Sequence, residues 1–265
     1  SLTNNRWYDP VGNVAKSLPA GADRWTKTTY DTLNRPTTVY AGYGTDASYA
    51  DIFDVTGDVV LEQAETAYDD ASNVTATTRR QRYHNASTSA TGSLNDPSTA
   101  PKARVTYAVI YPDPLGRAQA QANYGTNGGT ALTRPTTIPA RSDTVLVSSQ
   151  TFDAAGNLAA VTDPATMTTT IAYDDGGRRT DIVENATNSS SSSSSSSCTP
   201  SNDANRTTQL AYTPDGQLKT LTAVNAATGN QTTQYVYGTT LTDSDLAASL
   251  LLRSVIYPDS VGSSD

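Results

Sequence analysis

Large hydrophobic residues occur singly along most of the chain, as an aromatic residue before a short polar segment and a Val or Leu after it. The runs between these segments are rich in threonine, as at 26–29, 75–78 and 168–170. Thr, Tyr and Val favour a pleated, half-exposed surface. The residues on either side of a polar segment can pair across two strands. The pattern therefore predicts a repeated unit of strand, tight turn and strand.

The polar segments share a motif, an aromatic residue followed by Asp-x-x-Gly-Asn or Asp-x-x-Gly-Arg and then an apolar residue. Its clearest copies are residues 8–14 (Tyr-Asp-Pro-Val-Gly-Asn-Val) and 152–158 (Phe-Asp-Ala-Ala-Gly-Asn-Leu). Three variants keep the aromatic residue and the glycine but move the acid. The repeat positions are Tyr8, Asp9, Gly12 and Asn13; Tyr30 and Asp31; Phe53, Asp54 and Gly57; Tyr68 and Asp69; Phe152, Asp153, Gly156 and Asn157; Tyr173, Asp174 and Gly177; and, as variants, Tyr111, Asp113 and Gly116; Tyr212, Asp215 and Gly216; Tyr257, Asp259 and Gly262, with Tyr235–Gly238 as an eroded member.

Each motif residue has a role in turn geometry. Asp at the first turn position accepts hydrogen bonds from backbone N–H groups two residues on. Gly adopts the left-handed conformation that lets a short hairpin loop close with a bulge. Asn34 tolerates that conformation best where Gly is missing, whereas Ser72 is harder to explain. The motif is therefore predicted to be architectural.

The leading aromatic residues lie at intervals near 21 residues or near twice that number. We interpret the unit as 20–22 residues long and the double intervals as units whose own turn has degenerated. Residues 1–265 are then a single repeat array. Both ends fall within or close to a motif, which indicates a fragment of a longer protein.

The composition supports an all-β fold, because Leu, Glu, Lys and Met are sparse while Gly, Pro, Asn, Asp and Thr are abundant. A lone hairpin is marginally stable in water, so the units must join to bury their aromatic faces. We expect antiparallel strand–turn–strand repeats in one long curved or spiral sheet, a segment of a β-shell. Residues 84–103, 125–143 and 185–205, the last with consecutive serines at 189–197, are predicted to be flexible loop insertions.

Net charge and the available side-chain chemistry argue against several classes of function. The net charge of −8 and a pI of about 4.6 argue against nucleic acid as a partner, and no apolar run is long enough for a membrane span. The single histidine, His84, begins a polar loop, and the single cysteine, Cys198, lies beside the serine tract. No nucleophile motif or calcium-loop spacing occurs. We expect no catalytic residue, no metal and no cofactor.

Exposed aromatic rings are the alternative source of function, because they can stack on sugar faces. The candidates for glycan contact are Trp7, Trp25, Tyr43 and Tyr124, together with Tyr40 and Tyr49. The competing interpretation, which we favour, is that these rings line the strand interior.

The Tyr-Asp-x-x-Gly-Asn pattern resembles the YD-repeat or RHS-repeat family, most closely at residues 151–164. That resemblance implies a hollow spiral β-shell, which in bacterial polymorphic toxins and insecticidal toxin complexes encapsulates a C-terminal toxin and in teneurins serves adhesion. Some of these repeats have been linked to carbohydrate binding. The family's self-cleaving Asp-Pro-x-Gly-Leu ending has no counterpart here, because the similar Asp113–Gly116 segment lies in the register of a turn.

These observations predict a non-catalytic structural segment of an exported or cell-surface bacterial protein, building a shell or fibre wall. Its partners would be other segments of the same chain or other copies, with an encapsulated toxin domain or a surface glycan as further partners. The alternatives are an adhesin-like module that binds carbohydrate or a surface protein and, more remotely, a glycoside-acting enzyme.

Overall fold

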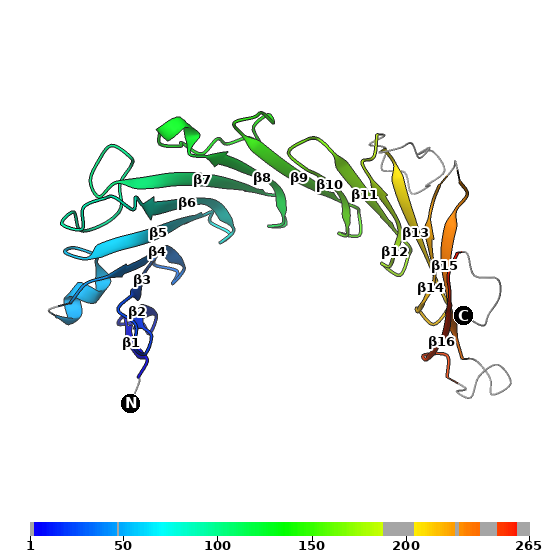
Figure 1. Cartoon of the computed structure of the whole chain (residues 1–265), viewed down its shortest axis with the longest axis horizontal. Helices are drawn as coiled ribbons and strands as arrows, with labels where there is room; N and C mark the ends of the chain where they lie inside the picture. Colours follow the sequence, from blue (N-terminus) through cyan, green and yellow to red (C-terminus); the bar gives the residue numbers. More distant parts are fainter. Residues whose placement is uncertain (1–2, 47, 188–203, 226–227, 239–247, 259–265) are drawn as a thin grey trace. The chain divides into compact units, whose positions relative to one another are not determined.

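The computed structural model describes residues 3–46, 48–187, 204–225, 228–238 and 248–258. The chain divides into two compact units, which we call unit 1 (Ser1–Val147) and unit 2 (Ser148–Asp265). Within the described residues the strands form one 16-stranded sheet in which each strand follows its predecessor in sequence (Figure 1). The strands are β1 (Asn5–Tyr8), β2 (Val14–Leu18), β3 (Trp25–Tyr30), β4 (Pro36–Tyr43), β5 (Val59–Tyr68), β6 (Val74–Arg82), β7 (Ala103–Pro112), β8 (Ala118–Gly125), β9 (Leu146–Phe152), β10 (Leu158–Thr162), β11 (Thr168–Tyr173), β12 (Arg179–Glu184), β13 (Arg206–Tyr212), β14 (Leu218–Ala223), β15 (Gln231–Tyr237) and β16 (Leu252–Ile256).

The paired strands are antiparallel, and their register follows from the motif. The aromatic residue that ends one strand lies opposite the residue six positions later, which begins the next strand, as in Tyr8 opposite Val14 and Phe152 opposite Leu158. The register shifts beside each of these pairs, as expected for a loop closed with a bulge. The predicted all-β class and the antiparallel strand–turn–strand repeat are confirmed.

The motif turns occupy one edge of the sheet in each unit. They follow β1, β3, β5 and β7 in unit 1 and β9, β11 and β13 in unit 2. The opposite edge carries the connections of variable length, including 44–58, 83–102 and 126–145. This arrangement corrects the interpretation of the double interval between Tyr68 and Tyr111. Tyr68 and Tyr111 are far apart in sequence because residues 83–102 separate β6 from β7, and no degenerated turn lies between them.

The copy at Phe53 is a second departure from the sequence prediction. Phe53 ends a short 3-10 helix, η1 (Tyr49–Phe53), instead of a strand. Gly57 has a φ of +83°, but the turn here is closed by the bond from the Asp58 N–H to the Val55 carbonyl. Since β4 precedes and β5 follows, this turn lies at the edge opposite the other motif turns. It resembles the repeat in sequence without sharing its place in the sheet.

The core of unit 1 near its first strands centres on Trp25, which is 2% exposed. Its ring packs with Val55, Val60 and Leu94, so residues from the connections 44–58 and 83–102 cover this face of the sheet. Gly42 lies opposite Trp25 in β4. A Cβ there would lie 2.5 Å from the Val59 carbonyl oxygen and 3.1 Å from the Trp25 ring. Glycine therefore permits the close approach of β4, β5 and the indole.

A second core of unit 1 lies over β7 and β8. Tyr111 faces the alanine at position 120 across the strands, and Val109 faces Ala122. The connection 126–145, which contains the 3-10 helix η2 (Asn127–Gly129), covers them with Leu132. Burial, reinforced by neighbouring Tyr124, raises the pKa of Tyr111 to about 12. Tyr111 is thus a core residue, unlike the other motif tyrosines.

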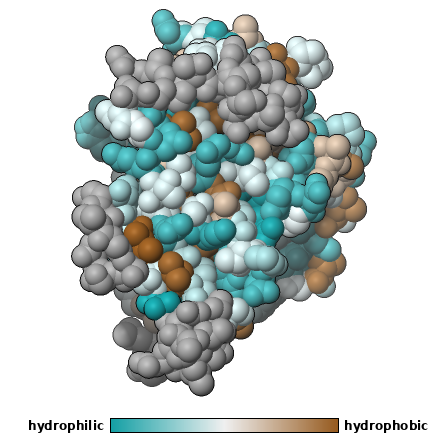
Figure 2. Space-filling view, turned by 90° about the vertical axis from the view of Figure 1, so that its right-hand side faces the viewer, coloured by the Kyte–Doolittle hydropathy of each residue, from teal (hydrophilic) through white to brown (hydrophobic). Residues whose placement is uncertain are grey.

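Unit 2 has thinner cover. Every residue of β10 and β11 is half-buried. Among the described residues of unit 2, Val183 of β12 is a buried hydrophobic residue. Figure 2 shows a face on which hydrophilic and intermediate residues predominate and hydrophobic residues are scattered in small groups. The Thr-rich strands of unit 2 therefore form a single layer with both faces partly accessible.

Candidate functional site

The motif turn at residues 153–157 shows the geometry that the repeat builds. The Asp153 N–H donates to the Asn157 carbonyl at 2.9 Å, and the Gly156 N–H donates to the Asp153 carbonyl at 3.0 Å. The Asp153 carboxylate accepts from the Asn157 backbone at 2.8 Å and from the Asn157 side-chain amide at 3.0 Å. Both carboxylate oxygens therefore lock the fifth residue of the loop onto the first.

The same arrangement recurs in both units, with arginine able to replace asparagine. Arg35 Nε lies 2.7 Å from Asp31 Oδ2, and Arg178 Nε lies 2.7 Å from Asp174 Oδ2. A guanidinium and an amide each present an N–H to the same oxygen, which explains why the sixth motif position accepts either residue. The pairs that form this lock are Asp9–Asn13, Asp31–Arg35, Asp69–Asn73, Asp113–Arg117, Asp153–Asn157 and Asp174–Arg178.

The sequence pattern indicated that three variants move the acid, and for two of them the structure gives another explanation. In the copy at Tyr212, Thr213 takes the place of the capping acid, and its hydroxyl accepts from the Gln217 N–H at 3.1 Å. In the copy at Tyr111, the acid keeps its place three residues before Gly116 and the aromatic residue is displaced instead. Pro112 occupies the aromatic position there, opposite the alanine at 118. For the third copy, Asp259 and Gly262 lie outside the described residues and Tyr257 is exposed.

The fourth turn position has a left-handed backbone in each described motif turn. Gly12, Gly116, Gly156, Gly177 and Gly216 have φ between +74° and +96°. Asn34 at +60° and Ser72 at +68° take the same conformation. A further turn, at residues 163–167, closes the opposite edge between β10 and β11 with Thr166 at a φ of +70°. A β-branched residue is poorly suited to that region.

We therefore expect Thr166→Gly to raise the free energy of unfolding of unit 2 by about 1 kcal/mol. Backbone strain of this kind costs about 1–3 kcal/mol, and glycine relieves it. Part of the gain is lost because glycine gives up more chain entropy on folding than threonine does. Thermal unfolding followed by circular dichroism measures the change. Ala165→Gly in the same turn is the matched control, because Ala165 does not have a positive φ. It should lower the stability, and an equal gain in both variants would contradict the strain at Thr166.

A ladder of tyrosine hydroxyls joins neighbouring motif turns, a feature that the sequence pattern did not predict. Each of these tyrosines ends a strand, and its hydroxyl donates to the carbonyl of the first residue of the preceding strand. Those two residues lie at the same sheet edge because neighbouring strands run in opposite directions. The bonds are Tyr30 to Val14 at 3.0 Å, Tyr68 to Pro36 at 3.0 Å, Tyr173 to Leu158 at 3.1 Å, Tyr212 to Arg179 at 2.9 Å and Tyr237 to Leu218 at 3.0 Å.

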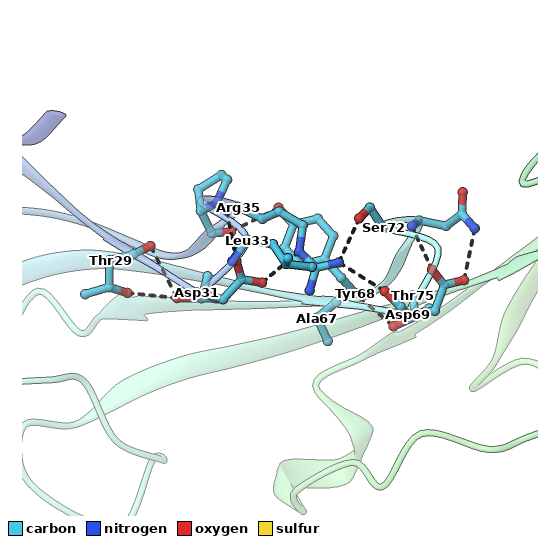
Figure 3. A network of polar contacts seen from close by, with 12 residues as sticks. Thr29, Asp31, Leu33, Arg35, Ala67, Tyr68, Asp69, Ser72 and Thr75 are labelled. Carbon is cyan, nitrogen blue, oxygen red and sulfur yellow. Dashed lines mark hydrogen bonds and ion pairs between the residues drawn. The ribbon is translucent and has the colours of Figure 1, made fainter. Parts of the chain in front are cut away.

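The arginine variants of the motif strengthen this ladder. Arg35 Nη1 donates to the Asp69 carbonyl and to the Ser72 hydroxyl, both at 3.0 Å, so one side chain ties two turns together (Figure 3). Its guanidinium also lies 4.6 Å from the centre of the Tyr68 ring. The bond from Arg35 to the Ser72 hydroxyl accounts for the serine at position 72. In unit 2, Arg178 lies in the same way over the ring of Tyr212, at 4.7 Å.

Acid should loosen the turns. Hydrogen bonds from the side chains of Asn73, Asn157 and Arg178, followed by backbone N–H groups, lower the pKa of Asp69, Asp153 and Asp174 from their ordinary value of 3.8. A lowered folded-state pKa contributes stability that is present above the unfolded value and is lost as the pH falls through the folded value.

We expect the melting temperature to fall with acidification below about pH 4, as measured by circular dichroism. Asp153→Asn cannot ionise, so it should weaken that acid dependence. An acid dependence identical to that of the unsubstituted chain would show that this cap does not contribute.

The structure separates the candidate glycan-contact residues. Trp25 and Tyr124 are 2% and 8% exposed and belong to the two cores of unit 1. Trp7 and Tyr43 are half-buried, with Trp7 beside the Lys16 ammonium at 5.1 Å. His84 lines a shallow depression with Arg82 and Glu62.

No group of three or more His, Cys, Asp or Glu side chains within the described residues is placed to hold a metal ion. In the same part of the chain, no helix has the length and hydrophobicity needed to cross a membrane. Cys198 lies outside the described residues.

Comparison with known proteins found similarity to solved structures and to one family model. Among solved structures, the chain is similar to the crystal structure of TcdB2-TccC3-TEV, with 10% identity and a TM-score of 0.47 over 96% of this chain and 11% of that one. It is also similar to TcdB2-TccC3-Cdc42, with 16% identity and a TM-score of 0.40 over 95% of this chain and 11% of that one. For the Photorhabdus luminescens Tc holotoxin pore, the values are 14% and 0.33 over 89% and 13%.

The chain thus spans only 11–13% of the length of these solved chains. A search of curated protein sequences gave no match. The sequence model described as RHS Repeat matches residues 152–188, which contain the lock between Asp153 and Asn157 and the ladder bond from Tyr173. The resemblance predicted from the motifs is confirmed at residues 152–188, which match the RHS repeat model.

Proposed function

We propose that the chain is a non-catalytic wall segment of an exported or cell-surface RHS-repeat protein, in which the sheet builds a β-shell or fibre. The tyrosine ladder carries this proposal. Each hydroxyl bond joins the end of one strand to the motif turn before it, so this edge of the sheet is braced at Tyr30 and Tyr68 in unit 1 and at Tyr173, Tyr212 and Tyr237 in unit 2. Such bracing stiffens an extended sheet and needs no ligand to do so.

The half-buried strands of unit 2 favour the interpretation that this sheet is a wall with contents or neighbours beside it. β10 and β11 have no fully buried and no fully exposed residue. A free-standing sheet usually buries one face and exposes the other. Further segments of the same long chain, other copies, or an enclosed toxin domain of the kind that the family resemblance implies would complete the burial.

Electron microscopy of the natural full-length protein tests the proposal. A wall segment predicts a hollow particle or fibre in which this sheet forms part of the boundary, with density inside if a cargo is enclosed. The same sheet folded as an isolated domain on a linker, without continuation of the strands on either side, would contradict it.

A pocket in unit 1 favours carbohydrate binding as a second candidate function. It measures about 450 Å³ and is lined by Tyr83, Tyr107, Asn95, Asp96 and Arg104 among others. Hydrogen bonds from Ser98 and then Thr99 lower the pKa of Asp96 to about 2, which keeps its carboxylate charged. Aromatic side chains beside amide, carboxylate and guanidinium groups are suited to sugar rings and hydroxyls.

A glycan array, followed by titration calorimetry of any sugar retained, tests this second function. Tyr83→Ala and Tyr107→Ala should each weaken binding at least tenfold, about 1.4 kcal/mol. Tyr257→Ala, an exposed tyrosine that does not line the pocket, is the matched control. Equal weakening by all three variants, or no retained sugar, would remove this candidate.

A further inference from the structure

A buried cluster of two lysines and two aspartates holds the connection 44–58 against β2 and β3. Lys27 is 2% exposed, Asp58 3% and Lys16 6%. Lys27 Nζ lies 2.7 Å from Asp58 Oδ2 and 2.7 Å from Asp46 Oδ1. Lys16 Nζ pairs with the other oxygen of Asp46. The four side chains are therefore electrically neutral as a group; Lys16, Lys27 and Asp58 are buried, and the Asp46 side chain is 11% exposed.

The surroundings of Lys27 Nζ fix its position further. The backbone carbonyls of Asp51 and Asp54 each accept from it at 2.8 Å. The Trp25 ring centre lies 4.8 Å away on the apolar side. Four acceptors thus surround an ammonium group that has only three hydrogens to donate. The amine is held in one place against the Asp58 carboxyl group.

We propose that Lys27 and Asp58 condense to an intramolecular isopeptide bond, with Asp46 transferring the protons. The carboxyl carbon of Asp58 lies one C–O bond, about 1.2 Å, beyond the oxygen that contacts Nζ, so it is within about 4 Å of the nitrogen. Two groups held at such a distance react with a large effective concentration. Nothing in the tyrosine ladder or the motif turns uses these residues.

The reaction requires the neutral forms of both groups, an amine and a carboxylic acid. A buried ion pair costs several kcal/mol per ion in desolvation, and transfer of one proton from Nζ to Oδ2 converts the pair into an amine and a carboxylic acid. The carbonyls of Asp51 and Asp54 can hold the two remaining N–H groups. The nitrogen lone pair is then free for the acid beside it.

The reaction balances without a co-reactant. Nζ attacks the Asp58 carboxyl carbon and forms the C–N bond, while Asp46 accepts the proton that nitrogen loses. Asp46 returns that proton to the departing hydroxyl, the C–O bond breaks and one water leaves. One ammonium and one carboxylate become one amide, nothing is oxidised or reduced, and Lys16 with Asp46 remains as a neutral pair.

Glycine at position 44 is part of the arrangement. A Cβ at Gly44 would lie 2.0 Å from Asp58 Oδ1, so the absence of a side chain leaves the space in which the carboxyl group sits. The bond would join β3 to the residue before β5 across 31 positions of sequence. It would fasten the connection 44–58 to the sheet covalently.

Intact-mass spectrometry of the purified, folded chain is the direct test. The expected mass is below the sequence mass by one water. Digestion with chymotrypsin should release a peptide containing Lys27 joined to one containing Asp58. Lys27→Arg and Asp58→Ala should show neither the mass loss nor the joined peptide. The full sequence mass in the folded chain, or a water loss without that joined peptide, would overturn the proposal.

Two further variants separate the bond from its mechanism. Asp58→Asn can form the same amide by losing ammonia, so its linked product should have the same mass as the linked unsubstituted chain. Asp46→Ala keeps both reacting groups and should slow linkage on the order of a hundredfold, the usual contribution of a general acid–base group. Unchanged linkage in Asp46→Ala would remove Asp46 from the mechanism.

Discussion

Replacing Lys27 by methionine is expected to lower the free energy of unfolding of unit 1 by at least about 3–5 kcal/mol, the usual effect of removing one partner from a buried ion pair, and by more where the reference chain carries the Lys27–Asp58 bond proposed above. Methionine fills much of the same volume but offers no donor. The carboxylate of Asp58, which is 3% exposed, would lose its counter-ion. Two backbone carbonyls would also lose their donor.

Tryptophan fluorescence during urea unfolding measures this loss in unit 1 alone, because the chain has two tryptophans, Trp7 and Trp25, and both belong to that unit. Lys102→Met is the matched control, since Lys102 is exposed in the same unit, and it should change stability by less than about 0.5 kcal/mol. Similar small effects in both variants would show that the Lys27 cluster is not a determinant of stability.

Trp25→Ala is expected to cost about 3–5 kcal/mol, in the range for removing a large aromatic side chain from a core. The indole is 2% exposed and fills the space between Val60, Leu94 and the backbone at Gly42. Those groups belong to three different parts of unit 1, so the void cannot close by moving one side chain. The opposite-edge connections should loosen with it.

Urea unfolding followed by far-ultraviolet circular dichroism measures the loss. Trp7→Ala is the matched control, because Trp7 is half-buried and makes a cation–π contact with Lys16. Such a contact is worth about 0.5–2 kcal/mol. An equal cost at both positions would contradict the assignment of Trp25 to the core.

The motif turns could be predicted from sequence because their interactions are local. Asp153 and Asn157 are four residues apart, and the preferences of Asp for capping and of Gly for positive φ act within that distance. Family resemblance rests on the same residues. The copy at Phe53 matches the motif in sequence but lies at the opposite edge of the sheet. The edge at which a turn lies depends on how many strands precede it, which the local motif does not record.

The ladder and the Lys27 cluster could not be predicted because they depend on register between segments far apart in sequence. Tyr68 reaches a carbonyl 32 residues away, and Lys27 reaches Asp58 across 31 residues. The structure also places Lys16 directly opposite Lys27. Like charges in that arrangement repel and require nearby acids, which is a signal that appears only once the strands are aligned.

Neighbouring motif turns within a unit brace one another, and hydrogen exchange in Asp174→Ala tests this most directly. Asp174 holds Arg178, and Arg178 lies over Tyr212 of the next motif turn. We predict faster amide exchange both at residues 173–179 and at residues 212–218 by mass spectrometry. Asp175→Ala, an exposed acid in the same turn, should leave both segments unchanged. Faster exchange confined to residues 173–179 would show that the turns are independent hairpins and contradict the account.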